Sequence, residues 1–285
     1  MQFTDHGVVM AFRDWVTLIS FEETDMTATR PLALVTGGSS GIGLELAKQF
    51  AQNGYDLVIS GSSDKVHSSA DELKALGVEC FPHQADAATY EGVQGLWDFV
   101  VSLGRPLEAA ALNVGIGQGG AFVDNDLEDD FKLIAINITG TVHMAKRVVK
   151  HMVDNGHGRI LVTSSISATQ PTPYETVYGP SKAFGFSFAE SLREELRDTG
   201  VTVTALLPGA TDSDFHKNAG MSNSKIGESK KNDKTEVARQ GFEALMNDVD
   251  HVVGGDEATK RKAIENRTTP EVVKAHNHAK NARLN

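Results

Sequence analysis

The feature that most constrains the fold is a regular alternation of short apolar runs with longer segments of helical periodicity, starting at Leu32. Runs rich in Val, Leu, Ile and Ala are typical of parallel strands that are buried on both faces. The expected strands are 32–36, 56–60, 78–84, 109–114, 159–164, 201–207 and a short run at 251–254. The helical segments are 42–54, 70–76, 90–103, 127–154, 176–197 and 236–247. This alternation predicts an α/β fold with a doubly wound parallel sheet.

A sheet of this kind has one edge at which ligands bind. Right-handed crossovers place the carboxyl ends of all its parallel strands along that edge. The chain of 285 residues is long enough for one sizeable domain. We therefore expect a Rossmann-like sheet of about seven strands with helices on both faces, and a functional site built from the loops that follow the strands.

A glycine-rich turn, Thr36-Gly-Gly-Ser-Ser-Gly-Ile-Gly43, separates the first expected strand from the first expected helix. Glycines let the chain turn sharply and let backbone N–H groups approach a pyrophosphate at the start of the helix. The same letters elsewhere would be typical of an ordinary loop, but this position predicts a dinucleotide site, and the turn lacks the G-K-[ST] of an ATP-binding loop. The residues expected to bind the cofactor here are Gly37, Ser39, Ser40, Gly41, Ile42 and Gly43.

Tyr178 and Lys182 are four residues apart, so they share a helical face if a helix begins at Tyr178 with Pro180 in its first turn. A nearby ammonium favours the phenolate, which lowers the pKa of a tyrosine from about 10 toward the range that suits acid/base catalysis. Because a Tyr-x-x-x-Lys spacing also occurs by chance, this pair alone does not identify a catalytic site.

Ser165 follows the expected strand 159–164 and reaches the same sheet edge, although Ser164 would take its place if the strand ended one residue earlier. The motifs T-G-x-x-x-G-x-G, this serine, and Y-x-x-x-K thirteen residues later resemble, in that order, the short-chain dehydrogenase/reductase (SDR) family over about residues 32–213. The resemblance implies an NAD(P)(H)-dependent oxidoreductase (EC 1.1.1.-) that interconverts a carbonyl and a secondary alcohol on a small organic substrate.

The resemblance also implies a role for each site residue. Ser165 would hydrogen-bond the substrate oxygen, Tyr178 would act as general acid/base, and Lys182 would hold the nicotinamide ribose. Asn137, in an N-x-x-G helix motif, would support a water-linked proton relay to the lysine. The alternative is that Asn137 is a buried amide with no role in catalysis. Further cofactor contacts are implied at Asp86, Ala87, Asn113, Gly115, Tyr178, Pro208, Gly209 and Thr211. The chain reads Leu-Asn-Val-Gly where the family has N-N-A-G, so we expect a local adjustment there.

The choice between the two nicotinamide cofactors depends on the residues after the second strand. An acidic residue there binds the ribose of NAD and repels a 2'-phosphate. In this chain the hydroxyls of Ser62 and Ser63, with Lys65 close behind, are suited to a phosphate, whereas Asp64 would repel it if it turned inward. The pattern favours NADP(H), with NAD(H) as the alternative, although no arginine is present to clamp the phosphate.

Composition limits the partners. A net charge of −11 disfavours a nucleic-acid surface, because phosphate binding depends on clustered Lys and Arg. The single cysteine, Cys80, excludes an internal disulfide and suits a reducing compartment. The sequence has no apolar run of the about 18 residues that a membrane span needs and no signal-peptide pattern, so we expect a cytoplasmic protein without membrane contact. Apolar faces on the helices that contain Asn137 and Tyr178 suggest a homodimer or homotetramer.

We expect a single NAD(P)-binding domain at 31–257, preceded by an N-terminal extension at 1–30 and followed by a helical or partly disordered tail at 258–285. By the resemblance, 210–235 would cover the substrate. Phe215 and Met221 would either contact it or pack on the domain. For the extension, two interpretations are open: Met26 is the natural start, or an amphipathic element packs on the domain through Phe12, Trp15, Leu18 and Ile19.

Two polar segments are interpreted as solvated surface. The acidic segment 247–256 lacks the ligand order of a calcium loop, so we expect no metal there. His276-Asn-His278 lies in the polar tail, where histidines two apart do not share a helical face.

Two other functions also fit the fold: a non-catalytic dinucleotide-binding protein, and an SDR-type isomerase or dehydratase.

Overall fold

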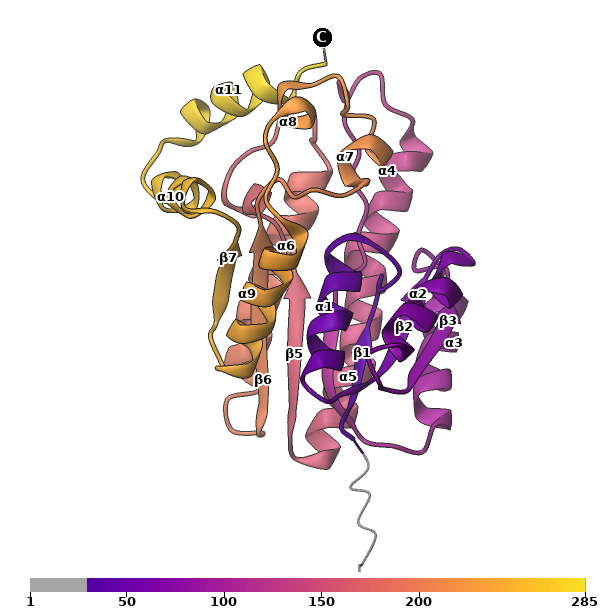
Figure 1. Ribbon diagram of the computed structural model, residues 1–285. Coiled ribbons are helices and arrows are strands. Elements are labelled where there is room, and N and C mark those ends of the chain that lie inside the picture. The colour runs from indigo at the N-terminus through magenta and orange to yellow at the C-terminus, as the bar shows by residue number, and fades with distance from the viewer. Residues whose placement is uncertain (1–29, 285) are drawn as a thin grey trace, which may run out of the picture.

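A computed structural model describes residues 30–284 of the chain (Figure 1). The expectations for Met26 and for the amphipathic element with Phe12, Trp15, Leu18 and Ile19 lie outside the described residues. Within the described part of the chain, no helix is both long and apolar enough to cross a membrane.

The strands form one parallel sheet with the order β3-β2-β1-β4-β5-β6-β7. Their bounds are Leu32–Val35 (β1), Asp56–Gly61 (β2), Cys80–Gln84 (β3), Leu107–Leu112 (β4), Gly158–Thr163 (β5), Val201–Pro208 (β6) and His251–Gly254 (β7). The strand order reverses between β1 and β4, which is the position where doubly wound sheets bind their ligands. The structure therefore confirms the Rossmann-like fold, including its short seventh strand.

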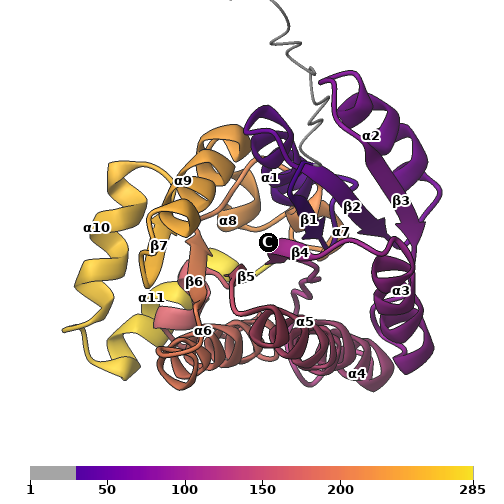
Figure 2. The ribbon, with the colours of Figure 1, turned by 90° about the horizontal axis from the view of Figure 1, so that it is seen from below.

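Helices cover both faces of the sheet, as the view along the strands shows (Figure 2). One face carries α1 (Gly41–Gln52), α2 (Lys65–Lys74) and α9 (Lys234–Met246). The other carries α3 (Tyr90–Ser102), α4 (Leu127–Ile134), α5 (Thr141–Asn155) and α6 (Tyr178–Glu195). Alternate residues of β1 enter the two cores, because side chains along a strand point to opposite faces: Leu32 and Leu34 to one, Ala33 and Val35 to the other.

Shorter elements and the C-terminal helices lie over the carboxyl ends of the strands (Figure 1). They are a 3-10 turn, Ile166–Thr169, with α7 (Phe215–Asn218), α8 (Lys225–Glu228), α10 (Glu257–Asn266) and α11 (Glu271–Ala282). The tail, for which the sequence left helix and partial disorder open, thus folds into two helices in the described residues. Its helix α11 extends over the sheet edge where the site residues gather.

The segment 127–154, expected as one helix, is instead interrupted between α4 and α5 by a π-helical turn, Ala135–Gly140. The close approach of another loop explains the glycine in this turn, since a Cβ at Gly140 would lie only 2.5 Å from the Ala87 carbonyl oxygen. Turns of this kind are often found at functional sites, and this one contains Asn137. The expected helix 70–76 also differs, because α2 begins at Lys65.

Candidate active site

A cleft of about 880 Å³ opens at the carboxyl edge of the sheet. Its walls come from the loops after β1 to β6, and every residue expected to bind the cofactor lines it except Ser63. Ser63 lies in the turn before α2, where its carbonyl accepts a hydrogen bond from the Val66 N–H and its side chain is exposed. The prediction for Ser63 is therefore not supported by its position, whereas Ser62 and Lys65 do face the cleft.

The glycine-rich turn forms a tight wall of the cleft. Gly37 and Gly41 have φ angles of 66° and 54°, in the left-handed region that favours glycine. A Cβ at Gly43 would lie 2.1 Å from the Gly37 carbonyl oxygen, so this position has no room for a side chain. The first turn of α1 contains no acidic residue, so its positive end is free to face an anion.

Asn113 holds this turn in place from the neighbouring strand end. Its side-chain Nδ2 donates to the Thr36 carbonyl at 3.2 Å, and its backbone N–H donates to the Thr36 hydroxyl at 3.0 Å. The Val114 N–H donates to the same hydroxyl at 3.2 Å. The second asparagine of the family motif thus fixes the β1 turn against β4, although the first is replaced by Leu112.

Ser165, Tyr178 and Lys182 come together at the end of β5 and the start of α6. The phenol and the ammonium are both buried, and the Lys182 Nζ lies 5.8 Å from the centre of the Tyr178 ring. The Ser165 hydroxyl accepts from the Ser167 N–H at 3.1 Å and is near enough to the phenol to favour the phenolate and so lower the pKa of Tyr178. The Ser164 hydroxyl donates instead to the Lys182 carbonyl at 2.7 Å, so it fastens β5 to α6. The geometry thus favours Ser165 over Ser164 for contact with a substrate.

Asn137 is buried behind the cleft and does not line it. Its amide oxygen accepts from the Ile116 N–H at 2.9 Å, and its Nδ2 donates to the Ile116 carbonyl at 2.9 Å and to the Ser181 hydroxyl at 3.0 Å. A Cβ at Gly115 would lie 2.8 Å from the Lys182 Nζ and 3.3 Å from the Asn137 Oδ1, so these two groups converge on the backbone of Gly115. Asn137 positions the loop after β4 against α6.

The protonation of the pair differs from the sequence-based expectation. Burial raises the pKa of Tyr178 above its ordinary value, the negative charge of Glu175 raises it further, and the Ser165 hydrogen bond opposes them. Burial lowers the pKa of Lys182 to about 8. The pKa of Tyr178 is therefore raised on balance, and not lowered as expected, because burial and Glu175 outweigh the groups that stabilise the phenolate. The Lys182 Nζ itself donates to the Thr163 carbonyl at 3.1 Å.

Sequence reasoning missed two polar residues of the cleft. Glu175 and His278 both line it, and the His278 Nε2 lies 3.0 Å from the Glu175 Oε2, within hydrogen-bond distance. The prediction of a solvated tail is wrong for His278, which is buried, and it fits His276, which is exposed. A signal was present, because the buried Lys274, His278 and Ala282 recur every four residues, the spacing of one helical face.

The covering segment resolves the choice left open for Phe215 and Met221. Phe215 lines the cleft, with its ring centre 5.2 Å from that of Tyr178. Met221 is fully buried and packs with Ala219 and Ala282 in a small cluster outside the main cores. Phe215 is therefore placed to contact a substrate, whereas Met221 fastens the segment to α11.

The comparison with protein families agrees with this geometry. A family model described as "short chain dehydrogenase" matches residues 31–224. The chain belongs to this family. The matched region contains the glycine-rich turn, Ser165, Tyr178 and Lys182, and it ends before α10 and α11.

Individual relatives are moderately similar. The probable oxidoreductase EphD of Mycobacterium tuberculosis is 33% identical over 192 residues, which are 67% of this chain and only 32% of EphD. The oxidoreductase UcpA of Salmonella typhimurium is 34% identical over 182 residues, 64% of this chain and 69% of UcpA. A short-chain dehydrogenase from Sphingobium yanoikuyae, solved with NADPH, superposes with a TM-score of 0.75 at 26% identity, covering 83% of this chain and 93% of that one.

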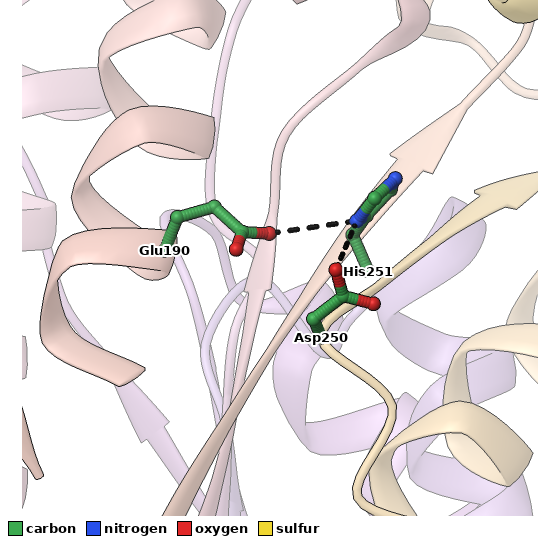
Figure 3. A group of neighbouring side chains, drawn as sticks. All are labelled: Glu190, Asp250 and His251. Atoms are coloured by element: carbon green, nitrogen blue, oxygen red, sulfur yellow. Dashed lines mark hydrogen bonds and ion pairs between the residues drawn. The ribbon is translucent and has the colours of Figure 1, made fainter. Parts of the chain in front are cut away.

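A separate polar group lies between α6 and β7 (Figure 3). The Nδ1 of His251 lies 2.9 Å from an Asp250 oxygen and 3.5 Å from a Glu190 oxygen, so these three residues have metal-ligand spacing. The other ring nitrogen of His251 contacts the Arg267 guanidinium at 3.3 Å. Both nitrogens are thus engaged in polar contacts, and the group is best described as a surface network of ion pairs.

Proposed function

We propose that this protein is an NAD(P)(H)-dependent oxidoreductase that interconverts a carbonyl and a secondary alcohol on a small organic substrate, with Tyr178 as general acid/base. The observation that carries the proposal is the convergence of Ser165, Tyr178 and Lys182 beside a cleft whose opposite wall is the glycine-rich turn. Family membership and the NADPH complex of the Sphingobium relative support the same reaction class.

The residues present fit a dinucleotide. Gly37, Gly41 and Gly43 bring the backbone of the turn to the wall of the cleft, and the N-terminus of α1 favours the negative charge of a pyrophosphate. Asp86 and Ala87 line the part of the cleft proposed for adenine, while Pro208 and Gly209 line the part proposed for nicotinamide. When bound, the nicotinamide supplies the hydride chemistry.

Residues of this chain supply the proton that the substrate oxygen takes up during reduction. In the reducing direction, the neutral phenol of Tyr178 donates its proton to the oxygen that develops negative charge, and Ser165 donates a hydrogen bond to the same oxygen. The positive charge of Lys182 stabilises the phenolate that remains. Because burial and Glu175 keep Tyr178 protonated, the site is suited to donate a proton, which favours carbonyl reduction.

The proposal includes an oligomer that acts in the cytoplasm. Leu127 and Phe131 on α4 and Val142 on α5 expose apolar side chains that a second copy would cover in a homodimer or homotetramer.

Burial raises the pKa of the Cys80 thiol to about 12, so the only cysteine of the chain is an unreactive core residue that suits a reducing compartment.

Replacing Tyr178 by Phe tests the central assignment. We expect Tyr178→Phe to reduce kcat for carbonyl reduction by a factor of about 10² to 10⁴, because the proton donor is lost, and to change NADPH affinity far less, because only one hydroxyl is removed. The exposed Tyr90, replaced by Phe in the same way, is the control and should retain full activity. Activity that survives in Tyr178→Phe would remove Tyr178 from its role, and a wild-type protein that binds NADPH but turns over no carbonyl or alcohol would favour the non-catalytic alternative.

The buried lysine predicts a pH dependence. Since the pKa of Lys182 is lowered to about 8, its ammonium is present below that pH and is lost above it. We expect kcat/KM for reduction to fall as the pH rises through this value, because the charge that stabilises the phenolate disappears. An active Lys182→Arg variant, whose guanidinium stays charged, should lack the decline. A wild-type profile that is flat across this range would contradict the assignment.

The end of β2 favours NADP(H) over NAD(H). Lys65 and Ser62 line the cleft, whereas the Asp64 side chain is 96% exposed and does not line it. We expect tighter binding of NADPH than of NADH, and a loss of about three- to fivefold in NADPH affinity in Lys65→Met with little change for NADH. Lys74→Met, on the same helix but away from the cleft, should change neither dissociation constant. Tighter binding of NADH by the wild-type protein would refute the preference.

A further inference from the structure

Glu175 lines the cleft, and only one of its two carboxylate oxygens is hydrogen-bonded to another side chain of residues 30–284. Glu175 precedes α6 and is 5% exposed, and its Oε2 accepts a hydrogen bond from the His278 Nε2 at 3.0 Å. No described residue is hydrogen-bonded to its other oxygen, Oε1, and the residue lines the cleft. The Oε1 of Glu175 can therefore accept a hydrogen bond from a ligand in the cleft.

A chain of hydrogen bonds holds this carboxyl group in place. The Asn266 Nδ2 lies 3.3 Å from the Gln170 Oε1, so the Gln170 oxygen accepts and its Nε2 donates to the His278 Nδ1 at 3.2 Å. With Nδ1 as the acceptor, His278 donates from Nε2 to Glu175 at 3.0 Å. The Glu175 side chain is thereby oriented beside the cleft.

A second polar group faces the same space. His216, on α7, lines the cleft, and its Nδ1 is buried without a hydrogen-bond partner among the described residues. Burial and the charge of Lys231 lower the pKa of His216, so its ring is neutral. Because an unpaired buried nitrogen costs free energy, the site gains when a ligand supplies the missing partner.

An aromatic ring lies between the proposed reacting centre and His216. The ring centre of Phe215 is 5.2 Å from that of Tyr178 and 5.5 Å from that of His216, and Ile226 also lines the cleft. A substrate that extends from Tyr178 toward His216 would contact Phe215. The arrangement fits a short aliphatic segment with a polar group at its far end.

We propose that Glu175 and His216 form a subsite for a hydroxyl or a protonated amine carried by the substrate away from its reacting carbon. The inference rests on the proposed function and adds the substrate class. A carboxylate only accepts hydrogen bonds, so it selects donors, binds cations more strongly and repels anions. The residues that hold it, Asn266 and His278, lie beyond residue 224, where the family match ends, so the selection belongs to this chain's own C-terminal helices.

The test uses linear methyl carbinols, oxidised with NADP⁺, whose far end is methyl, hydroxyl, ammonium or carboxylate and whose chain grows by one carbon at a time. The four substrates of one set have the same chain length, so they differ only in the polarity and charge of the far end group. At one chain length we expect kcat/KM of the wild-type protein to be about tenfold or more higher for the ammonium and hydroxyl ends than for the methyl end, and lowest for the carboxylate.

Glu175→Gln, which keeps the shape and removes the charge, should abolish the preference for ammonium over methyl. The matched control is Glu228→Gln in α8, which removes the same charge from the covering segment away from the cleft and should preserve the ratio. Ratios are compared because Glu175 also raises the pKa of Tyr178 and so affects every substrate.

The outcomes separate this inference from the proposed function. Turnover of methyl carbinols without a donor preference at any length, or a preference that persists in Glu175→Gln, would overturn the subsite and leave the oxidoreductase standing. If Glu175→Gln does not fold, the wild-type ranking decides alone, since a methyl end used as well as ammonium at every length overturns the subsite. Absence of turnover for every carbinol and carbonyl would overturn both.

Discussion

The attachment of the β5 end to the first turn of α6 is the constraint on which the site depends. Two hydrogen bonds make it, from the Ser164 hydroxyl to the Lys182 carbonyl and from the Lys182 Nζ to the Thr163 carbonyl. The next residue, Ser165, lies close enough to the phenol of Tyr178 to influence its pKa. A strand end and a helix start that are distant in the sequence thereby form one rigid unit, and such rigidity is what a proton donor needs to meet its acceptor.

Burial sets the chemistry of this unit. Removing Tyr178 and Lys182 from water disfavours the charged form of each, so the pKa of the phenol rises and that of the ammonium falls to about 8. The carboxylate of Glu175, anchored by His278 of α11, adds to the effect on the phenol. One acidic residue thus links the protonation of Tyr178, the proposed proton donor, to the subsite that we propose for the substrate's donor group.

The sequence predicted the parts of the structure that local patterns encode. The strands, most helices and the turn at Gly37 to Gly43 follow from hydrophobic periodicity and from residues with special backbone requirements. The π-helical turn at Asn137 was missed because the approach of Ala87 to Gly140 is a contact between distant segments. The burial of His278 does not follow from the local sequence, because its partner, Glu175, lies 103 residues earlier in the chain. Such pairings depend on tertiary packing and leave only a weak periodic trace.

The central claim is that Ser165 and Tyr178 act on one oxygen as a single unit. The most direct measurement compares kcat/KM for carbonyl reduction in Ser165→Ala, Tyr178→Phe and the double variant. Residues that act together give losses that are far from additive, so we expect the double variant to be about as active as the weaker single variant. If the two losses multiply in the double variant, the residues act independently, and the geometry described for this site is not its mechanism.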